Sequence, residues 1–293
     1  MLRNAFVVSV PATSANVGPG FDAVGIALSL RVTAYVRPAS RFSLDIGGPH
    51  LPTHGGYEHA IRRAILHRSK RLPPVAIVVH NPIPLGKGLG SSAAAAVLGL
   101  AIAQRCARGR VDRRELARDA ARLEGHADNA FAAVYGGAVI ATAASSIALR
   151  APSDLRALVV VPEVAFPTSA ARRLLPDSYT RSDAAFTAGH ASLLGAALAT
   201  GNWRVLGDAM RDRLHQPYRA RAIPGLERAL AVSMPGLVGI ALSGAGPSVF
   251  AFVRDGAHTG VAKAISRRFS DAGVASNVLH LSFAADGARV RRA

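Results

Sequence analysis

A glycine-rich segment between residues 84 and 94 carries the strongest chemical signal in the sequence. Three alternate glycines leave room for the backbone to wrap around an anion, and two serines then open a run of good helix formers. The first turn of such a helix presents free N–H groups and a partial positive charge. The spacing is neither the P-loop pattern nor the dinucleotide-binding fingerprint, and the alternative is a flexible loop capped by Ser91. The expected phosphate-binding residues are Pro84, Leu85, Gly86, Lys87, Gly88, Leu89, Gly90, Ser91, Ser92, Ala93 and Ala94.

Two further loops hold polar side chains between glycines. Residues 11–25 read Pro-Ala-Thr-Ser-Ala-Asn-Val-Gly-Pro-Gly-Phe-Asp-Ala-Val-Gly, and residues 242–248 read Leu-Ser-Gly-Ala-Gly-Pro-Ser. In the first of these loops Asp22 can accept a hydrogen bond from an ammonium group or a hydroxyl, and the amide of Asn16 can both donate and accept. Asn and Asp also favour such loops for their turn geometry alone, so the residue types leave both interpretations open.

The three loops, in this order, resemble the three motifs of the GHMP kinase superfamily, which includes galactokinases, homoserine kinases and mevalonate kinases. Residues 84–94 are similar to its Pro-x-x-x-Gly-Leu-Gly-Ser-Ser-Ala-Ala phosphate loop, and residues 11–25 have the form characteristic of homoserine kinases. Ala127 stands where the family pattern usually has proline, and the resemblance covers nearly the whole chain. Residues 123–129, 171–176 and 217–219 also resemble the family's Glu-Gly-His-Pro-Asp-Asn, Arg-x-x-Leu-Pro and Pro-Tyr-Arg segments.

The resemblance implies a fold and a reaction. The fold would be α+β, the two-domain GHMP kinase fold, with a ribosomal-S5-domain-2-like α/β domain over residues 1–153 and a ferredoxin-like α+β domain over residues 154–293. Gly244 and Gly246 of the last loop would close on the nucleotide phosphates, with the substrates in the cleft between the domains. The reaction would be ATP-dependent phosphorylation of the side-chain hydroxyl of L-homoserine to O-phospho-L-homoserine, in threonine biosynthesis.

A magnesium site is expected where the phosphate loop ends. Phosphoryl transfer needs charge neutralisation on the triphosphate and an acceptor hydroxyl held in line. Mg²⁺ prefers oxygen ligands and keeps several waters, so the Ser92 hydroxyl and the Glu124 carboxylate are the expected pair, as the resemblance also implies. Taken alone, Glu124 could equally be a solvated carboxylate at a helix end.

Homoserine carries a carboxylate, an ammonium and a hydroxyl, and each needs a different partner. Arg172 and Arg219 are the expected carboxylate clamp, because a guanidinium fork fits a carboxylate with two hydrogen bonds. Arg173, the next residue, could take this role in place of Arg172. Two mechanisms then compete: Asp22 is a general base, or Asp22 anchors the ammonium while Asn129 orients the hydroxyl. We favour the second, because a loose, metaphosphate-like transition state asks little of a base.

Three neighbouring polar residues receive supporting roles. Asn16 shares the first loop with Asp22 and is expected to bind the substrate with it. His126 could donate to phosphate or substrate, but a histidine in a Gly-His-Ala turn is as often a structural hydrogen-bonder. Lys87 lies in the phosphate loop and lends positive potential. Neither His126 nor Lys87 is expected to be essential.

Strands and helices must position these loops, and hydrophobic patterning indicates where they lie. Strands 5–10 and 75–80 are expected to end at Pro11 and Pro82, and Asp112 and Glu115 form a capping-box pattern. The residues after Tyr135 suggest a turn that feeds a strand ending near residue 141. The other strands are predicted at residues 158–162, 237–242 and 248–253. Helices are predicted at residues 91–105, 112–123, 184–199, 203–213 and 226–233.

Length and composition favour a globular protein. Half of the 293 residues are apolar, enough to bury the cores of one large or two moderate domains. No uncharged apolar run reaches the ~18 to 20 residues that a membrane span needs, and residues 1–5 lead into a strand pattern rather than a signal peptide, so we expect a soluble cytoplasmic protein. Cys106 lies in an Ala-rich helical pattern and is expected to be a structural thiol.

The formal net charge of +17 does not by itself indicate a nucleic-acid partner. Only three of the 35 basic residues are lysines, and the arginines are dispersed, without a long block or interleaved aromatic residues. An anionic substrate such as a nucleotide is compatible with this charge. We therefore expect no nucleic-acid and no membrane partner.

Three alternatives remain at this point. Another kinase of the superfamily could act on a threonine-like, mevalonate-like or sugar alcohol, and a pocket without paired arginines would favour the uncharged sugars. A non-catalytic sensor could bind nucleotide and ligand, although it would not need Ser92, Glu124 and Asp22 together. A nucleic-acid binder would lose affinity steeply with salt. A homodimer is implied by the family only.

Overall fold

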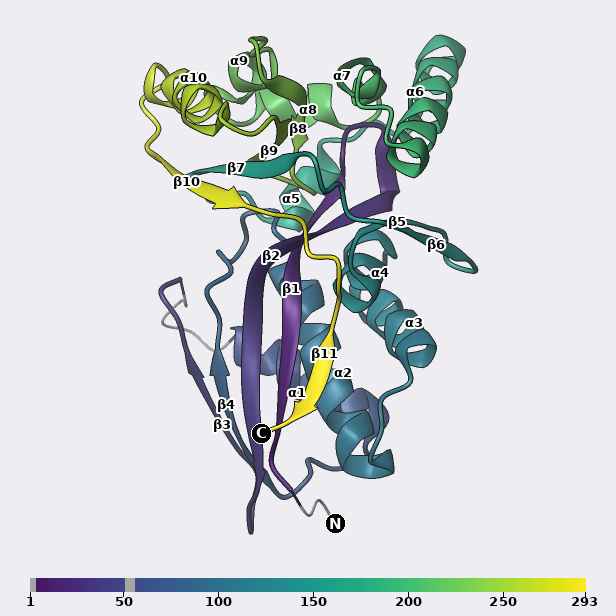
Figure 1. The fold of residues 1–293 in the computed structure, drawn as a ribbon, viewed down its shortest axis with the longest axis vertical. Helices are drawn as coiled ribbons and strands as arrows, with labels where there is room; N and C mark the ends of the chain where they lie inside the picture. Colours follow the sequence, from purple (N-terminus) through teal and green to yellow (C-terminus); the bar gives the residue numbers. More distant parts are fainter. Residues whose placement is uncertain (1–3, 51–55) are drawn as a thin grey trace.

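The computed structural model of the chain describes residues 4–50 and 56–293, and its described strands form two sheets (Figure 1). The larger sheet has the order β11-β1-β2-β4-β3, and β5 pairs with the first part of β2 and in turn with β6. Its strands are β1 (Phe6–Asn16), β2 (Gly20–Pro38), β3 (Ser43–Gly47), β4 (Val75–His80), β5 (Ala138–Ala141), β6 (Ser146–Leu149) and β11 (Arg289–Arg292). The smaller sheet, in the order β10-β7-β9-β8, consists of β7 (Arg156–Pro162), β8 (Leu237–Leu242), β9 (Val249–Val253) and β10 (Ser276–Leu281).

Four helices accompany the larger sheet: α1 (Gly56–Arg68), α2 (Ser91–Arg108), α3 (Arg113–Glu124) and α4 (Asp128–Tyr135). Helices α2 and α4 pack against β1 and β2, and α1 and α3 pack against α2. Helix α2 consists largely of small and aliphatic residues because most of its circumference is buried. At Gly99 a Cβ atom would lie 2.6 Å from the Ile61 carbonyl oxygen, so the close contact between α1 and α2 depends on this glycine.

The two central strands of the smaller sheet are apolar without alternation because both of their faces are buried. Val159 and Phe250 face the core shared with the larger sheet, whereas Val160 and Ala251, the next residues along, pack with α9 and α10. The helices of this half are α5 (Thr168–Arg173), α6 (Arg181–Thr200), α7 (Leu206–Ala209), α8 (Gln216–Arg221), α9 (Leu226–Leu230) and α10 (His258–Ser270).

The end of the chain returns to the larger sheet. After β10 the chain passes Phe283, which bridges to Leu28 of β2, and ends in β11, which pairs antiparallel with β1 (Figure 1). The domain division at residues 153 and 154 stays a prediction. The chain changes from the larger to the smaller sheet between β6 and β7. Strand β11 falls within the predicted second range, residues 154–293, but it belongs to the larger sheet because its backbone groups pair with β1.

Some predicted elements differ from the structure. The first strand continues through Pro11 to Asn16, because the register between β1 and β2 shifts just after Pro11 and such an irregularity tolerates a residue without an N–H donor. The predicted helix at 203–213 is reduced to α7, and the one at 226–233 ends at Leu230. The strands at 75–80 and 237–242 are confirmed.

Two further expectations concern single features. Cys106 is partly buried, and burial raises the pKa of its thiol to about 11, which keeps it uncharged at neutral pH. None of the described helices combines the length and apolar character that a membrane crossing requires. Of residues 1–5, for which a signal peptide was considered and not expected, residues 1–3 lie outside the described residues.

Candidate active site

One cleft, with a volume of about 120 Å³, gathers residues from all three glycine loops. It brings together every residue predicted to act in catalysis, in acceptor binding and in metal binding. The lining consists of Ala15, Asn16, Asp22, Gly86, Gly88, Leu89, Gly90, Ser91, Ser92, Glu124, His126, Asp128, Asn129, Thr168, Arg172, Arg219, Gly244 and Ala245. Six residues predicted to bind nucleotide do not line it: Pro84, Leu85, Lys87, Ala93, Ala94 and Gly246.

The phosphate loop owes its shape to glycine. Gly86, Gly88 and Gly90 have φ angles of 66°, 75° and 64°, a conformation that residues with a Cβ adopt only with strain. Gly90 is also the N-cap of α2, and no side chain of the described residues caps the helix there, so the first N–H groups of α2 are available to an anion at the cleft. The loop therefore has the local geometry expected of a phosphate site.

The other two loops are tied directly to the phosphate loop and to each other. The hydroxyl of Ser243, in the last loop, donates to the Gly88 carbonyl oxygen at 2.7 Å. The Gly244 N–H donates to the Ala15 carbonyl oxygen at 3.0 Å, and the Asn16 side-chain amide donates to the Gly244 carbonyl oxygen at 2.8 Å. These bonds join segments that are far apart in the sequence and fix the three loops around one space.

Lys87 points out of the cleft. Its ammonium group donates to the carbonyl oxygens of Pro162 and Val164, both at 2.8 Å, so the side chain ties the phosphate loop to the end of β7. Burial lowers the pKa of this amine, and Glu163 partly offsets the effect. Ala93 and Ala94 turn into the core because α2 has already begun at Ser91.

The two predicted metal ligands are in contact. The Ser92 hydroxyl donates to the Glu124 carboxylate at 2.9 Å, across 32 residues of sequence. Burial raises the pKa of the Glu124 carboxyl, and the Ser92 hydrogen bond works in the opposite direction. A hydroxyl oxygen and a desolvated carboxylate side by side are a donor set that fits a hard divalent cation.

Asp22 is held in place from two sides. Its N–H donates to the Asn16 side-chain oxygen at 2.9 Å, and both residues have positive φ angles, 55° and 68°. Its carboxylate accepts two hydrogen bonds from the Arg172 guanidinium, at 2.9 and 3.1 Å. Arg172 thus forms a two-pronged ion pair with Asp22, while Arg173, its neighbour, does not line the cleft.

Arg219 is the buried member of the predicted clamp, with 2% of its surface exposed. Its guanidinium donates to the Gly244 carbonyl oxygen at 3.3 Å and to Nδ1 of His215 at 3.1 Å. Since Nδ1 accepts this bond, the proton of a neutral His215 is on Nε2, which donates to the Gly18 carbonyl oxygen at 2.8 Å. Burial and the nearby Arg172 lower the pKa of Arg219 to about 10, so it remains charged at neutral pH.

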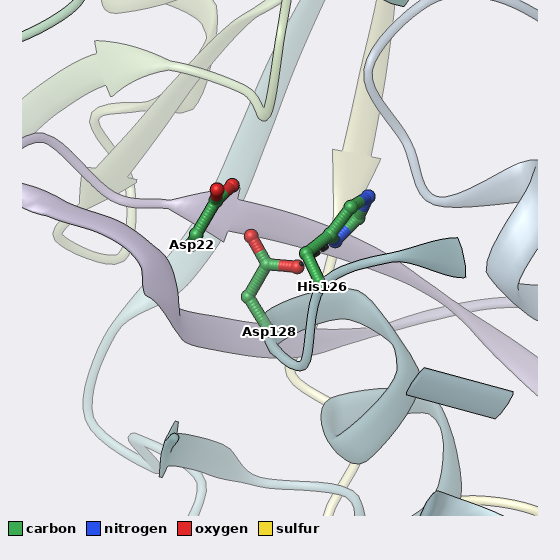
Figure 2. Close-up of side chains that lie close together, drawn as sticks. All are labelled: Asp22, His126 and Asp128. Atoms are coloured by element: carbon green, nitrogen blue, oxygen red, sulfur yellow. Dashed lines mark hydrogen bonds and ion pairs between the residues drawn. The ribbon is translucent and has the colours of Figure 1, made fainter. Parts of the chain in front are cut away.

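A second polar cluster lies beside the ion pair. The side-chain oxygens of Asp22 and Asp128 and the His126 ring lie within 4.8 Å of one another, and Figure 2 shows Asp128 between the other two. Asp128 is buried and is hydrogen-bonded to His126. Burial acts against a charged His126, but Asp128, Asp22 and Glu124 outweigh it and raise its pKa. The cluster therefore places a second carboxylate, that of Asp128, beside Asp22 in this part of the cleft.

Four polar residues near or in the cleft were not assigned roles from the sequence. Thr13 donates to the Asn129 side-chain oxygen, Asp128 accepts from the Asn129 N–H, and His215 supports Arg219. All three lie inside or next to segments that resemble family motifs, so their position in those motifs could have identified them as candidate site residues. Thr168, at the start of α5, lines the cleft without any such signal.

The sequence matches two family descriptions, "GHMP kinases N terminal domain" over residues 58–137 and "GHMP kinases C terminal" over residues 194–274. The homoserine kinase of Solibacter usitatus is 40% identical, with 98% of each chain covered. A homoserine kinase of Thermus thermophilus is 40% identical, over 88% of this chain and 90% of the relative. A crystal structure of homoserine kinase from Cytophaga hutchinsonii superimposes with a TM-score of 0.84 at 27% identity, covering 99% of this chain and 98% of that one.

A two-domain fold with three glycine loops around one cleft is the architecture of a small-molecule kinase, and the fold predicted from the motifs is confirmed. The chain belongs to the GHMP kinases and, within them, to the homoserine kinase family.

Proposed function

We propose that this protein transfers the terminal phosphoryl group of ATP to the side-chain hydroxyl of L-homoserine, yielding O-phospho-L-homoserine. The observation that carries the proposal is the ion pair between Asp22 and Arg172, next to the phosphate loop. An α-amino acid carries an ammonium and a carboxylate on one carbon, and a carboxylate beside a guanidinium is complementary to both groups. A sugar or a mevalonate-like acid lacks the ammonium and would offer Asp22 no cationic group of its own.

The nucleotide half of the reaction would rest on the phosphate loop. Backbone N–H groups at the start of α2 are free to bind phosphate oxygens, and Ser92 with Glu124 would hold Mg²⁺. When bound, the ion supplies neutralisation of the negative charge on the triphosphate. Gly246 lies outside the lining, so the last loop would contribute through Gly244 and Ala245.

The acceptor half would rest on five side chains. Arg172 and Arg219 would share the carboxylate, because both guanidinium groups reach the cleft from α5 and α8. Asp22 would anchor the ammonium, with Asp128 adding negative charge behind it. Both carboxylate oxygens of Asp22 already face a cation, the Arg172 guanidinium, and an ammonium group could take a similar position, which supports the anchor over the general base. Asn129 would orient the hydroxyl.

The direct test is an assay of ADP release with Mg-ATP that compares L-homoserine with L-threonine, L-serine, mevalonate and galactose. We expect turnover selective for homoserine. Selective turnover on another alcohol would replace the substrate and keep the kinase class, and ligand binding without turnover on any alcohol would favour the non-catalytic sensor. As an ATP-consuming biosynthetic enzyme the protein would work in the cytoplasm. Assembly as a homodimer stays a prediction.

A further inference from the structure

A buried hydroxyl next to the cleft, that of Thr13, is hydrogen-bonded to the side-chain amide of Asn129. Thr13 lies on β1, none of its surface is exposed, and its hydroxyl donates to Oδ1 of Asn129 at 2.6 Å. The Thr13 N–H donates to the carbonyl oxygen of Leu89 in the phosphate loop at 3.1 Å. The hydroxyl is therefore fixed in place relative to both the phosphate loop and the acceptor site.

The packing around this hydrogen bond leaves little freedom. A Cβ on Gly90 would lie 1.9 Å from Oγ1 of Thr13 and 3.0 Å from Oδ1 of Asn129, so only glycine allows the loop, the hydroxyl and the amide to meet. The Asn129 N–H is bound to the Asp128 carboxylate at 2.6 Å, which fixes the backbone that carries the amide. In this arrangement the Asn129 side chain turns its oxygen toward Thr13.

The donor and acceptor pattern decides what Asn129 can offer. A side-chain amide has one oxygen that accepts and one nitrogen that donates twice. The oxygen is engaged by Thr13, and within residues 4–50 and 56–293 no hydrogen bond involves the nitrogen. Asn129 lines the cleft, so the group that it presents there is the NH₂.

We infer that Thr13 is a positioning residue for phosphoryl transfer, which holds Asn129 so that its NH₂ donates to the acceptor hydroxyl oxygen. This inference rests on the proposed function and refines it. A donating Asn129 can hold the hydroxyl oxygen in line with the phosphate, but it cannot take the hydroxyl proton. That proton then leaves toward a phosphate oxygen, while the new O–P bond forms and the bond from the terminal phosphorus to the bridging oxygen breaks, releasing ADP, in keeping with a loose transition state.

The first test is Thr13→Val, which keeps the shape of the side chain and removes the hydroxyl. The amide can then rotate, and we expect kcat with homoserine to fall about 10- to 100-fold, while KM for ATP changes less than about twofold. Thr13→Ser retains the hydroxyl and should restore kcat to within about threefold of the wild type. Thr187→Val changes a buried threonine of α6 outside the cleft and should leave kcat unchanged.

A second variant tests the polarity of the amide directly. Asn129→Asp can still accept from Thr13, but it turns an oxygen toward the cleft where the NH₂ had been. We expect it to be as inactive as Asn129→Ala, and we expect adding Thr13→Val to Asn129→Ala to cause little further loss.

Several results would overturn the inference while leaving the proposed function intact. They are wild-type kcat in Thr13→Val, an equal loss in Thr13→Ser, or substantial activity in Asn129→Asp. Additive losses in the double variant would have the same meaning. Melting temperatures identify a variant that fails to fold. If Thr13→Val does not fold, the activity of Asn129→Asp compared with that of Asn129→Ala decides whether the amide must donate. Absence of wild-type turnover on every alcohol would instead overturn the proposed function and this inference with it.

Discussion

The two halves of the cleft are built by different means. The phosphate half is centred on one continuous segment, residues 84–94, whose shape comes from backbone conformation, with glycines at positive φ and the uncapped start of α2. The acceptor half is assembled from β1, β2, α4, α5 and α8, and its shape comes from hydrogen bonds and ion pairs between side chains. Each half therefore depends on a different property of its residues.

This difference predicts how each half should fail. Apart from the Ser92 and Glu124 pair, the phosphate half has little side-chain chemistry to lose, but it has no room for an added Cβ atom at the points where two loops touch. The acceptor half is partly exposed at Asp22 and Arg172, so it tolerates changes of volume but not of charge or hydrogen-bonding geometry. Substitutions that separate volume from charge can test the contrast.

The largest effect is expected in the phosphate half, from Gly88→Ala. The new Cβ would lie 2.1 Å from the Ser243 carbonyl oxygen and would push the phosphate loop away from the last loop. We expect kcat/KM for ATP to fall at least about 100-fold, the scale of the loss when one preorganised hydrogen-bond donor is removed from an active site. Steady-state kinetics with varied ATP, together with the melting temperature, measures this.

Gly86→Ala is the matched control for that substitution. Gly86 has a similar φ angle in the same loop, but nothing lies within 4 Å of its Cβ position. It should cost only the strain of the left-handed conformation, about 1 kcal/mol of stability, with a loss of kcat/KM of a few-fold. Equal losses in the two variants would show that conformational strain, rather than contact between the loops, governs the phosphate half.

Asp22→Asn addresses the acceptor half and should have the next largest effect. The amide keeps the volume of the side chain and its backbone bond to Asn16, but it removes the charge that pairs with Arg172. We expect KM for homoserine to rise about 10- to 100-fold and KM for ATP to change little, because a charged hydrogen bond contributes about 1.5–3 kcal/mol. A fall in kcat without a change in homoserine KM would instead assign Asp22 the role of base.

The contrast between the halves also explains what the sequence could predict. The phosphate loop was predictable because its function depends on glycine spacing and on the helix that follows, both of which are local. The third glycine loop and most acceptor residues were predictable only through motif resemblance. Once motif position was known, Asn16, Asp22, Glu124, Asn129, Arg172 and Arg219 all proved to line the cleft.

Contacts between residues far apart in the chain could not be predicted from the sequence. Arg172 and Asp22 are 150 residues apart, and their ion pair exists only because α5 is folded over the start of β2. Lys87 seemed suited to phosphate from its place in the loop, but the end of β7 supplies two carbonyl oxygens that draw it away. Strand β11 belongs to the larger sheet because it pairs with β1, at the other end of the chain, and the local sequence pattern does not show this pairing.

Arg172→Lys separates hydrogen-bonding geometry from charge in the acceptor half and should have a smaller effect. Lysine keeps the positive charge but cannot make the two parallel hydrogen bonds of a guanidinium. We expect KM for homoserine to rise about 5- to 10-fold, with kcat reduced less. Arg173→Lys, one residue along and outside the cleft, should leave both constants unchanged. An equal effect of the two substitutions would show that only net charge near the cleft matters.

The smallest expected effect concerns stability rather than catalysis, and it comes from His215. Burial, with help from Arg219 and against Asp212, lowers the pKa of this histidine from 6.5 to about 4. Between those pH values the unfolded chain binds a proton there and the folded chain does not. The stabilising contribution is therefore complete above about pH 6.5 and is lost progressively as the pH falls toward 4.

His215→Gln makes this contribution measurable, because glutamine offers an oxygen and an NH₂ in place of the two ring nitrogens but does not titrate. Between about pH 7 and pH 5 the wild-type free energy of unfolding should fall about 1–2 kcal/mol further than that of the variant, measured by urea denaturation at each pH. The raised pKa of His126 acts in the opposite direction but is present in both proteins and cancels. Parallel pH profiles would mean that His215 is not held neutral in the fold. The support of Arg219 would then need a charged imidazolium, which could not accept a hydrogen bond from the guanidinium at Nδ1.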